Sequence, residues 1–137
     1  MDKNRNKINR NMLTQLLINE QNDVEYYQQL LTENLNEAFI AAIERIRDDE
    51  IRHFILTREL YCRLFRCEPK LPPVSEVVFT SISQALSDAV DNELRGFEKY
   101  RDIYISNGEM FIKELFFELM TDELLHSAIL TKLLKCD

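Results

Sequence analysis

A pattern of acidic, tyrosine and histidine residues occurs twice in this sequence, and each residue of the second copy lies 73 positions after its counterpart. It consists of a glutamate, a tyrosine seven residues later, and an Asp-Glu-x-x-His motif whose glutamate follows the first by 30 residues. Both copies interrupt stretches whose apolar residues recur every three or four positions, the spacing of one helix face. The copies are Glu20, Tyr27, Asp49, Glu50 and His53, and Glu93, Tyr100, Asp122, Glu123 and His126. The chain must therefore build two similar helix pairs with polar groups on their apolar faces.

Four long stretches have this helical periodicity and predict an all-α chain. Only 2 Gly and 3 Pro interrupt the 137 residues, which favours long helices over many short strands. The expected helices cover about residues 6–33, 37–65, 82–107 and 110–135.

Polar residues mark the expected helix boundaries. Asn34 followed by Glu37, and Ser81 followed by Gln84, match the start signal in which a side chain caps the first turn. Asn107-Gly108 should end the third helix, because glycine accepts the left-handed conformation of a helix cap.

The three prolines lie between the second and third helices, in residues 68–80, and divide the chain into two hairpins. Each hairpin alone would leave an apolar face in water, so we expect residues 1–137 to form one domain, a four-helix bundle. In each hairpin the first glutamate and the Glu-x-x-His motif lie roughly 20–25 Å from the turn, at about 1.5 Å per residue. All would then meet in one layer if the proline segment crosses the length of the bundle. Alternatively, two chains could exchange hairpins in a domain swap, and each bundle would then combine hairpins from both chains.

Four glutamates and both histidines of the chain fall within these apolar stripes. Burying one carboxylate is costly, and burying four near one another requires compensating positive charge. Two divalent cations would neutralise four carboxylates, and Glu-x-x-His places both of its ligands on one helix face. We therefore predict a two-metal site. Its expected ligands are Glu20, Glu50, His53, Glu93, Glu123 and His126.

The identity of the metals follows from the ligand types. Carboxylates with two imidazoles favour iron, with manganese or a mixed pair as alternatives, over structural zinc. A bundle that keeps the pattern but binds nothing and a site for one metal are the competing interpretations.

Four neighbouring residues are candidates for a supporting role. Asp49 and Asp122 can accept the second ring N–H of the histidines, since metal-bound histidine usually has such a partner. The alternative is that they are ordinary acids of the helix surface. Tyr27 and Tyr100 lie on the ligand faces, two turns from Glu20 and its counterpart, and could equally be core aromatics.

Composition excludes some functions. A net charge of −7 argues against binding to nucleic acid, and no apolar stretch approaches the length of a membrane span. Met1 to Asn11 is polar and lacks the apolar run of a secretory signal. The three cysteines form no C-x-x-C motif, so we expect free thiols in a reducing cytoplasm.

The fourth expected helix also carries apolar residues away from its ligand face: Phe117, Met120, Leu124 and Leu125. They could be covered by the crossover segment or form a homodimer interface, and the sequence leaves both open.

The pattern Glu20, Glu50-x-x-His53, Glu93, Glu123-x-x-His126 resembles that of the ferritin-like superfamily of di-iron carboxylate proteins, over nearly the whole chain. The tyrosine seven residues after each first glutamate and the proline-containing crossover most resemble rubrerythrin-like proteins. Asp49-Glu50-Ile51-Arg52-His53 is also similar to the motif of bacterial di-iron monooxygenases and bacterioferritins.

Two features depart from the rubrerythrin pattern. Rubrerythrins carry a C-terminal rubredoxin domain with paired C-x-x-C motifs, and no such motif occurs here. They also have a further glutamate where this chain has Gly96, which argues against their redox-linked ligand exchange. Asp23, the counterpart of Gly96 in the first half, could be a seventh carboxylate or cap the site.

The resemblance implies a ferritin-like bundle that reacts with dioxygen, peroxide or ferrous iron. We expect an oxidoreductase, a rubrerythrin-like peroxidase or ferroxidase, that depends on an external electron donor because no cluster or flavin motif is visible. The alternatives are a non-catalytic bundle that binds metal or handles iron, and a di-iron oxygenase acting on an organic substrate.

Overall fold

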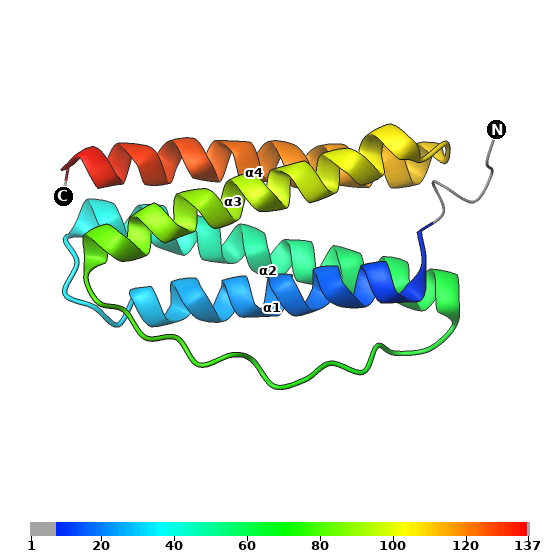
Figure 1. Ribbon diagram of the computed structural model, residues 1–137, viewed down its shortest axis with the longest axis horizontal. Coiled ribbons are helices and arrows are strands. Elements are labelled where there is room, and N and C mark those ends of the chain that lie inside the picture. Colours follow the sequence, from blue (N-terminus) through cyan, green and yellow to red (C-terminus); the bar gives the residue numbers. More distant parts are fainter. Residues whose placement is uncertain (1–7, 137) are drawn as a thin grey trace. The chain divides into compact units, whose positions relative to one another are not determined.

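The structure is a computed structural model that describes residues 8–136, and these form four α-helices and no strand. The helices are α1 (Arg10–Leu30), α2 (Glu37–Phe65), α3 (Ile82–Ser106) and α4 (Met110–Cys136) (Figure 1). This confirms the all-α class and is consistent with the predicted four-helix bundle. None of the four helices combines the length and apolar character needed to cross a membrane.

Asparagine and serine side chains set the helix starts. Asn9 accepts a hydrogen bond from the backbone N–H of Met12 at 2.8 Å, so α1 begins at Arg10, later than predicted. Residues 6 and 7, where the predicted helix starts, lie outside the described residues. Asn36, not Asn34, caps α2, while Ser81 caps α3 as predicted.

The predicted glycine cap of the third helix is wrong. Gly108 does not adopt a positive φ, and α3 ends at Ser106 with Asn107 as an extended C-cap. The side chain of Asn107 accepts a hydrogen bond from the N–H of Glu109 at 2.9 Å and thereby forms the turn itself. The left-handed cap occurs instead at Arg66, after α2, with φ of 60°.

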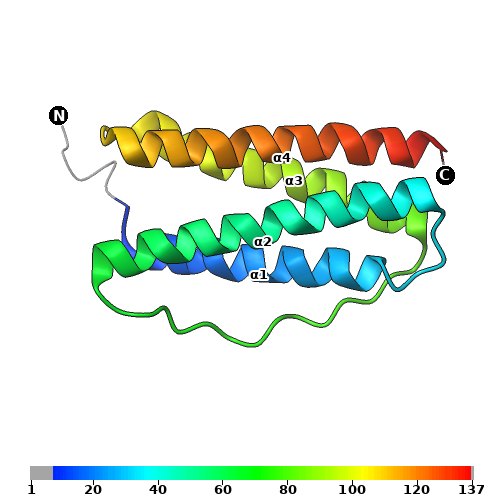
Figure 2. The same cartoon turned by 180° about the vertical axis from the view of Figure 1, so that it is seen from behind.

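The chain divides into two compact units, each containing one helical hairpin. Asn9–Val78 contains α1 and α2, and Phe79–Asp137 contains α3 and α4. Within each unit the two helices run antiparallel and side by side (Figures 1 and 2). The prediction of one domain over residues 1–137 stays a prediction.

Aliphatic and aromatic side chains on the facing sides of the helices form the core of each hairpin. Burial of one Leu, Ile or Phe side chain contributes roughly 1.5–3 kcal/mol. In the α1–α2 hairpin they include Leu13, Leu16, Leu17, Leu30, Phe39, Ile43, Ile46 and Leu60. In the α3–α4 hairpin they include Ala85, Leu86, Ala89, Ile103, Ile112, Phe116, Leu119 and Leu130.

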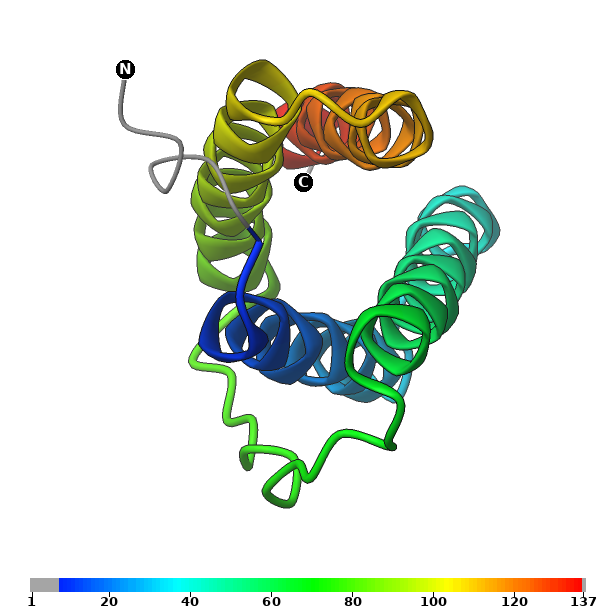
Figure 3. The same cartoon turned by 90° about the vertical axis from the view of Figure 1, so that its right-hand side faces the viewer.

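The segment that follows α2 runs back along α1 (Figure 1), on the outer side of this hairpin (Figure 3). It leaves α2 where the Arg10 guanidinium lies 5.3 Å from the Phe65 ring centroid. Further along, the Gln21 amide donates to the carbonyl of Pro72 at 2.8 Å. The long crossover predicted from the prolines therefore lies on the hairpin that precedes it.

An ion pair ties the end of α2 to the start of this segment. The Arg58 guanidinium donates two hydrogen bonds, each 2.8 Å long, to the Glu68 carboxylate. They lower the pKa of Glu68 and raise that of Arg58. Partial burial, and then the charge of Glu68, raise the pKa of the Cys62 thiol. All three cysteines of the chain are free.

Candidate metal centre

In the first hairpin the three predicted ligands lie on the inner faces of both helices. Glu20 comes from α1, and Glu50 and His53 come from successive turns of α2. Each has a relative exposure of 0%. His53 Nδ1 lies 3.5 Å from Glu50 Oε2. Helical periodicity therefore brings these carboxylates and this imidazole into the interior, as the sequence predicts.

A residue that sequence reasoning missed contacts this group. The Thr57 hydroxyl is buried and donates a hydrogen bond of 2.9 Å to Glu20 Oε2, which joins α2 to α1. One signal could have identified it, since it is a polar residue in the apolar stripe one turn after His53. Its counterpart 73 positions later is Leu130, so the duplication does not include this residue.

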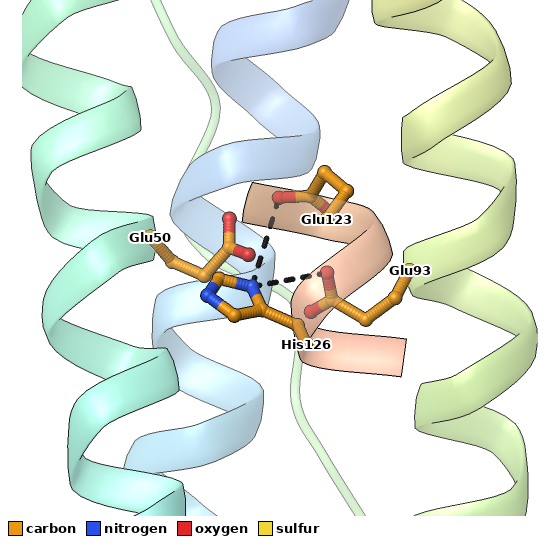
Figure 4. A group of neighbouring side chains, drawn as sticks. All are labelled: Glu50, Glu93, Glu123 and His126. Carbon is orange, nitrogen blue, oxygen red and sulfur yellow. Dashed lines mark hydrogen bonds and ion pairs between the residues drawn. The ribbon is translucent and has the colours of Figure 1, made fainter. Parts of the chain in front are cut away.

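In the second hairpin the three predicted ligands converge. Glu93 comes from α3, and Glu123 and His126 come from α4, and all three are buried. His126 Nδ1 lies 3.3 Å from Glu93 Oε2 and 4.0 Å from Glu123 Oε1 (Figure 4). One ligand atom from each residue lies within 4.8 Å of the others, so this group could hold a metal ion. Figure 4 also draws Glu50, which belongs to the first hairpin.

The same histidine atom faces a carboxylate in both hairpins. Nδ1 of His53 faces Glu50, and Nδ1 of His126 faces Glu93 and Glu123. Neutral imidazole can carry its lone pair on Nδ1 and donate through Nε2, which is the form that binds metals. This orientation suits a cation placed between the ring and the carboxylates.

The charge of the buried groups also favours a bound cation. Each hairpin buries two carboxylates and one imidazole, so its ligand group carries −2 with neutral histidine and −1 with protonated histidine. A single divalent cation would neutralise it, which reduces the cost of holding ionised groups away from water. Oxygen and imidazole donors without thiolate suit iron or manganese. The residues present could therefore hold a metal ion, and the identity of the metal stays a prediction.

Gly96 makes room for one of the ligands. A Cβ atom at this position would lie 2.8 Å from Glu123 Oε2, closer than real Cβ contacts come. The carboxylate of Glu123 therefore lies against the backbone of α3, one turn after Glu93. Sequence reasoning treated Gly96 only as a departure from a family pattern and missed this contact.

The predicted supporting acids are less buried than the predicted ligands. Asp49 is half-buried, and one of its oxygens lies 3.8 Å from the Arg52 guanidinium on the same helix. Asp122 and Asp23 are also half-buried. Their roles, as acceptors for the histidines and as a seventh carboxylate, stay predictions.

Both predicted tyrosines are buried in their hairpins. Tyr27 is 1% exposed and meets Tyr26 edge-on at 5.6 Å between ring centroids. Tyr100 is 4% exposed and lies 5.8 Å from the Phe116 ring. These packing contacts are those of core aromatics, and a role toward the metal ligands stays a prediction.

Comparisons with known proteins do not assign this chain to a family. No protein-family model matches the sequence, no curated protein matches it, and no solved structure matches it. The resemblance to rubrerythrin-like proteins therefore depends on the types and spacing of the ligand residues. What the structure supports directly is a buried group of glutamates and histidine that could hold a metal ion.

Proposed function

We propose that this protein is a di-metal carboxylate protein in which each hairpin supplies the ligands of one metal ion. The expected pair is iron, with manganese or a mixed pair as alternatives. The main support is the burial of the duplicated glutamates and histidines, with each histidine Nδ1 facing a carboxylate. In this proposal the hairpins combine into one ferritin-like four-helix domain, so that both metals share one centre. The ligands are Glu20, Glu50, His53, Glu93, Glu123 and His126.

The proposed activity is oxidoreduction, either the reduction of peroxide or the oxidation of ferrous iron by dioxygen or peroxide. The buried carboxylates and imidazoles of the chain would hold the metal pair. When bound, the pair would supply electrons and polarise the O–O bond of the oxidant. An external donor returns the electrons, and the free thiols suit the reducing cytoplasm as the location.

The helices also keep water from the ligands. Each ligand glutamate has a buried aliphatic residue one turn before it on the same helix. These residues are Leu16, Ile46, Ala89 and Leu119. An apolar surrounding strengthens the electrostatic attraction between carboxylates and cations, because it lowers the local dielectric constant.

The proposal is tested by anaerobic loading of the metal-free protein with ferrous iron. We expect two iron ions per chain after removal of excess metal. Addition of peroxide or air should then produce the near-ultraviolet absorption of ferric iron, with consumption of the oxidant. Failure to retain any iron or manganese would overturn the proposal.

A double substitution tests the ligand assignment. Glu50→Ala with Glu123→Ala should abolish the binding of both metals. The matched control is Glu44→Ala with Glu114→Ala, which removes exposed glutamates from the same two helices and should leave metal content unchanged. Unchanged metal content in the ligand variant would show that the assignment is wrong. Two tightly held metals without turnover of peroxide or dioxygen would favour the non-catalytic, iron-handling alternative.

A further inference from the structure

The two hairpins have the same ligands but differ in the residues that contact them. Thr57 in the first hairpin corresponds to Leu130 in the second, and Asp23 corresponds to Gly96. Thr57 and Gly96 each contact a ligand glutamate. The two hairpins therefore share the same proposed ligands, but different residues position these ligands in each hairpin.

Glycine at position 96 lets the second ligand group converge. Because no Cβ stands there, the Glu123 carboxylate can approach α3 closely, and its other oxygen lies 4.0 Å from His126 Nδ1. Together with Glu93 these donors already lie within 4.8 Å of one another. A ligand set that is gathered before the cation arrives loses less conformational freedom on binding.

The first ligand group is arranged differently. The Thr57 hydroxyl donates a hydrogen bond to Glu20 Oε2 and so fixes the orientation of this carboxylate. Within residues 8–136, Glu20 and His53 belong to no group of three potential ligands as compact as the second one. This group must therefore rearrange more when a cation binds.

We propose that the two metal positions are unequal: the Glu93, Glu123 and His126 position, shaped by Gly96, fills first, and the Glu20, Glu50 and His53 position, supported by Thr57, fills second and more weakly. This inference rests on the proposed di-metal function. Gly96 and Thr57 are positioning residues, since each acts through a glutamate.

The first experiment is a titration of the metal-free protein with manganese(II), following the electron paramagnetic resonance signal of the unbound ion and the heat of binding. We expect two binding steps whose dissociation constants differ about tenfold or more, the range by which groups around metal ligands change affinity. Two equal sites would overturn this inference and leave the di-metal proposal intact. Absence of binding would overturn the di-metal proposal itself.

Gly96→Ala tests the tighter step. The methyl group would displace the Glu123 carboxylate, a flexible side-chain end, so the protein should fold while the tighter step weakens about tenfold. Alanine is also the better helix former, so the metal-free protein should unfold at the same or a higher temperature. The control is Gly108→Ala, since a Cβ there meets nothing within 4 Å and its φ is not positive. Equal weakening of both steps, or of neither, would contradict the assignment.

Thr57→Val tests the weaker step. Removal of the hydroxyl releases Glu20 from its fixed orientation, so the weaker step should lose about tenfold in affinity while the tighter step stays unchanged. Thr57→Ser keeps the hydroxyl and should restore the weaker step. Loss of affinity in both Thr57 variants alike, or a change confined to the tighter step, would refute the role given to this residue.

Discussion

At the scale of single residues, the two glutamates of the second hairpin lie at different distances from one imidazole nitrogen. His126 Nδ1 is 3.3 Å from Glu93 Oε2 but 4.0 Å from Glu123 Oε1. Both carboxylates therefore lie beside the same imidazole, and their like charges are held close together away from water.

This proximity of two buried carboxylates predicts the effect of Glu123→Gln on stability. Removal of one of the two charges should raise the free energy of unfolding of the metal-free protein, because it relieves the repulsion between like charges held away from water. The same change should weaken metal binding. Urea denaturation with a chelator present measures the first effect. A loss of stability would show that repulsion between the two carboxylates does not destabilise the metal-free protein.

The burial of the proposed ligand residues was predictable from sequence, but their contacts were not. Four glutamates in apolar helical stripes had to be buried, and the structure buries all of them. The contact between Thr57 and Glu20 joins two helices and depends on their relative rotation, which one-helix periodicity does not specify. Gly96 likewise has no side chain to reveal its role, which appears only when Glu123 of the neighbouring helix lies against it.

At the scale of helices, the periodicity of apolar residues predicted all four elements, while the ends depended on local capping. Asn9 and Asn36 determine two starts because their side chains accept backbone hydrogen bonds from the first turn. The prediction for Gly108 failed because Asn107 forms that turn with its own side chain. Arg66 adopts the left-handed cap after α2, close in sequence to the Arg58–Glu68 ion pair. Sequence patterns do not favour arginine in this conformation, because glycine is the usual residue there.

The ion pair at the end of α2 predicts a pH-dependent stability. The hydrogen bonds from Arg58 lower the pKa of Glu68, so the folded state favours the ionised carboxylate. This contribution is present above the ordinary pKa of glutamate and is lost as the pH falls through the lowered value. Glu68→Gln should therefore be slightly less stable than the unchanged protein at pH 7, with a difference that disappears in acid. The effect is small because both groups are solvent-exposed.

Thermal unfolding at several pH values in the presence of a chelator measures this contribution. The matched control is Glu59→Gln, which removes an exposed glutamate from the same end of α2. A stability difference for Glu68→Gln that grows in acid would have the wrong sign for this ion pair.

At the scale of the whole molecule, the duplicated ligands suggest why two hairpins remain in one chain. Each ligand group carries negative charge inside an apolar hairpin, and the chain as a whole has a net charge of −7. Cations held by a shared centre would neutralise both groups at once. Metal binding would then be linked to the association of the hairpins as well as to their separate stability.

This linkage predicts how metal changes unfolding. With free metal at about 100 times the dissociation constant, each bound ion should add about 2.7 kcal/mol to the stability of the folded state. Calorimetry should then show one transition at a higher temperature in the metal-loaded protein, and no shift in the Glu50→Ala, Glu123→Ala variant. Two separate transitions that move independently with metal would show that each hairpin binds its ion alone. In that case the local ligand groups would stand, but the shared centre and its two-metal chemistry would not.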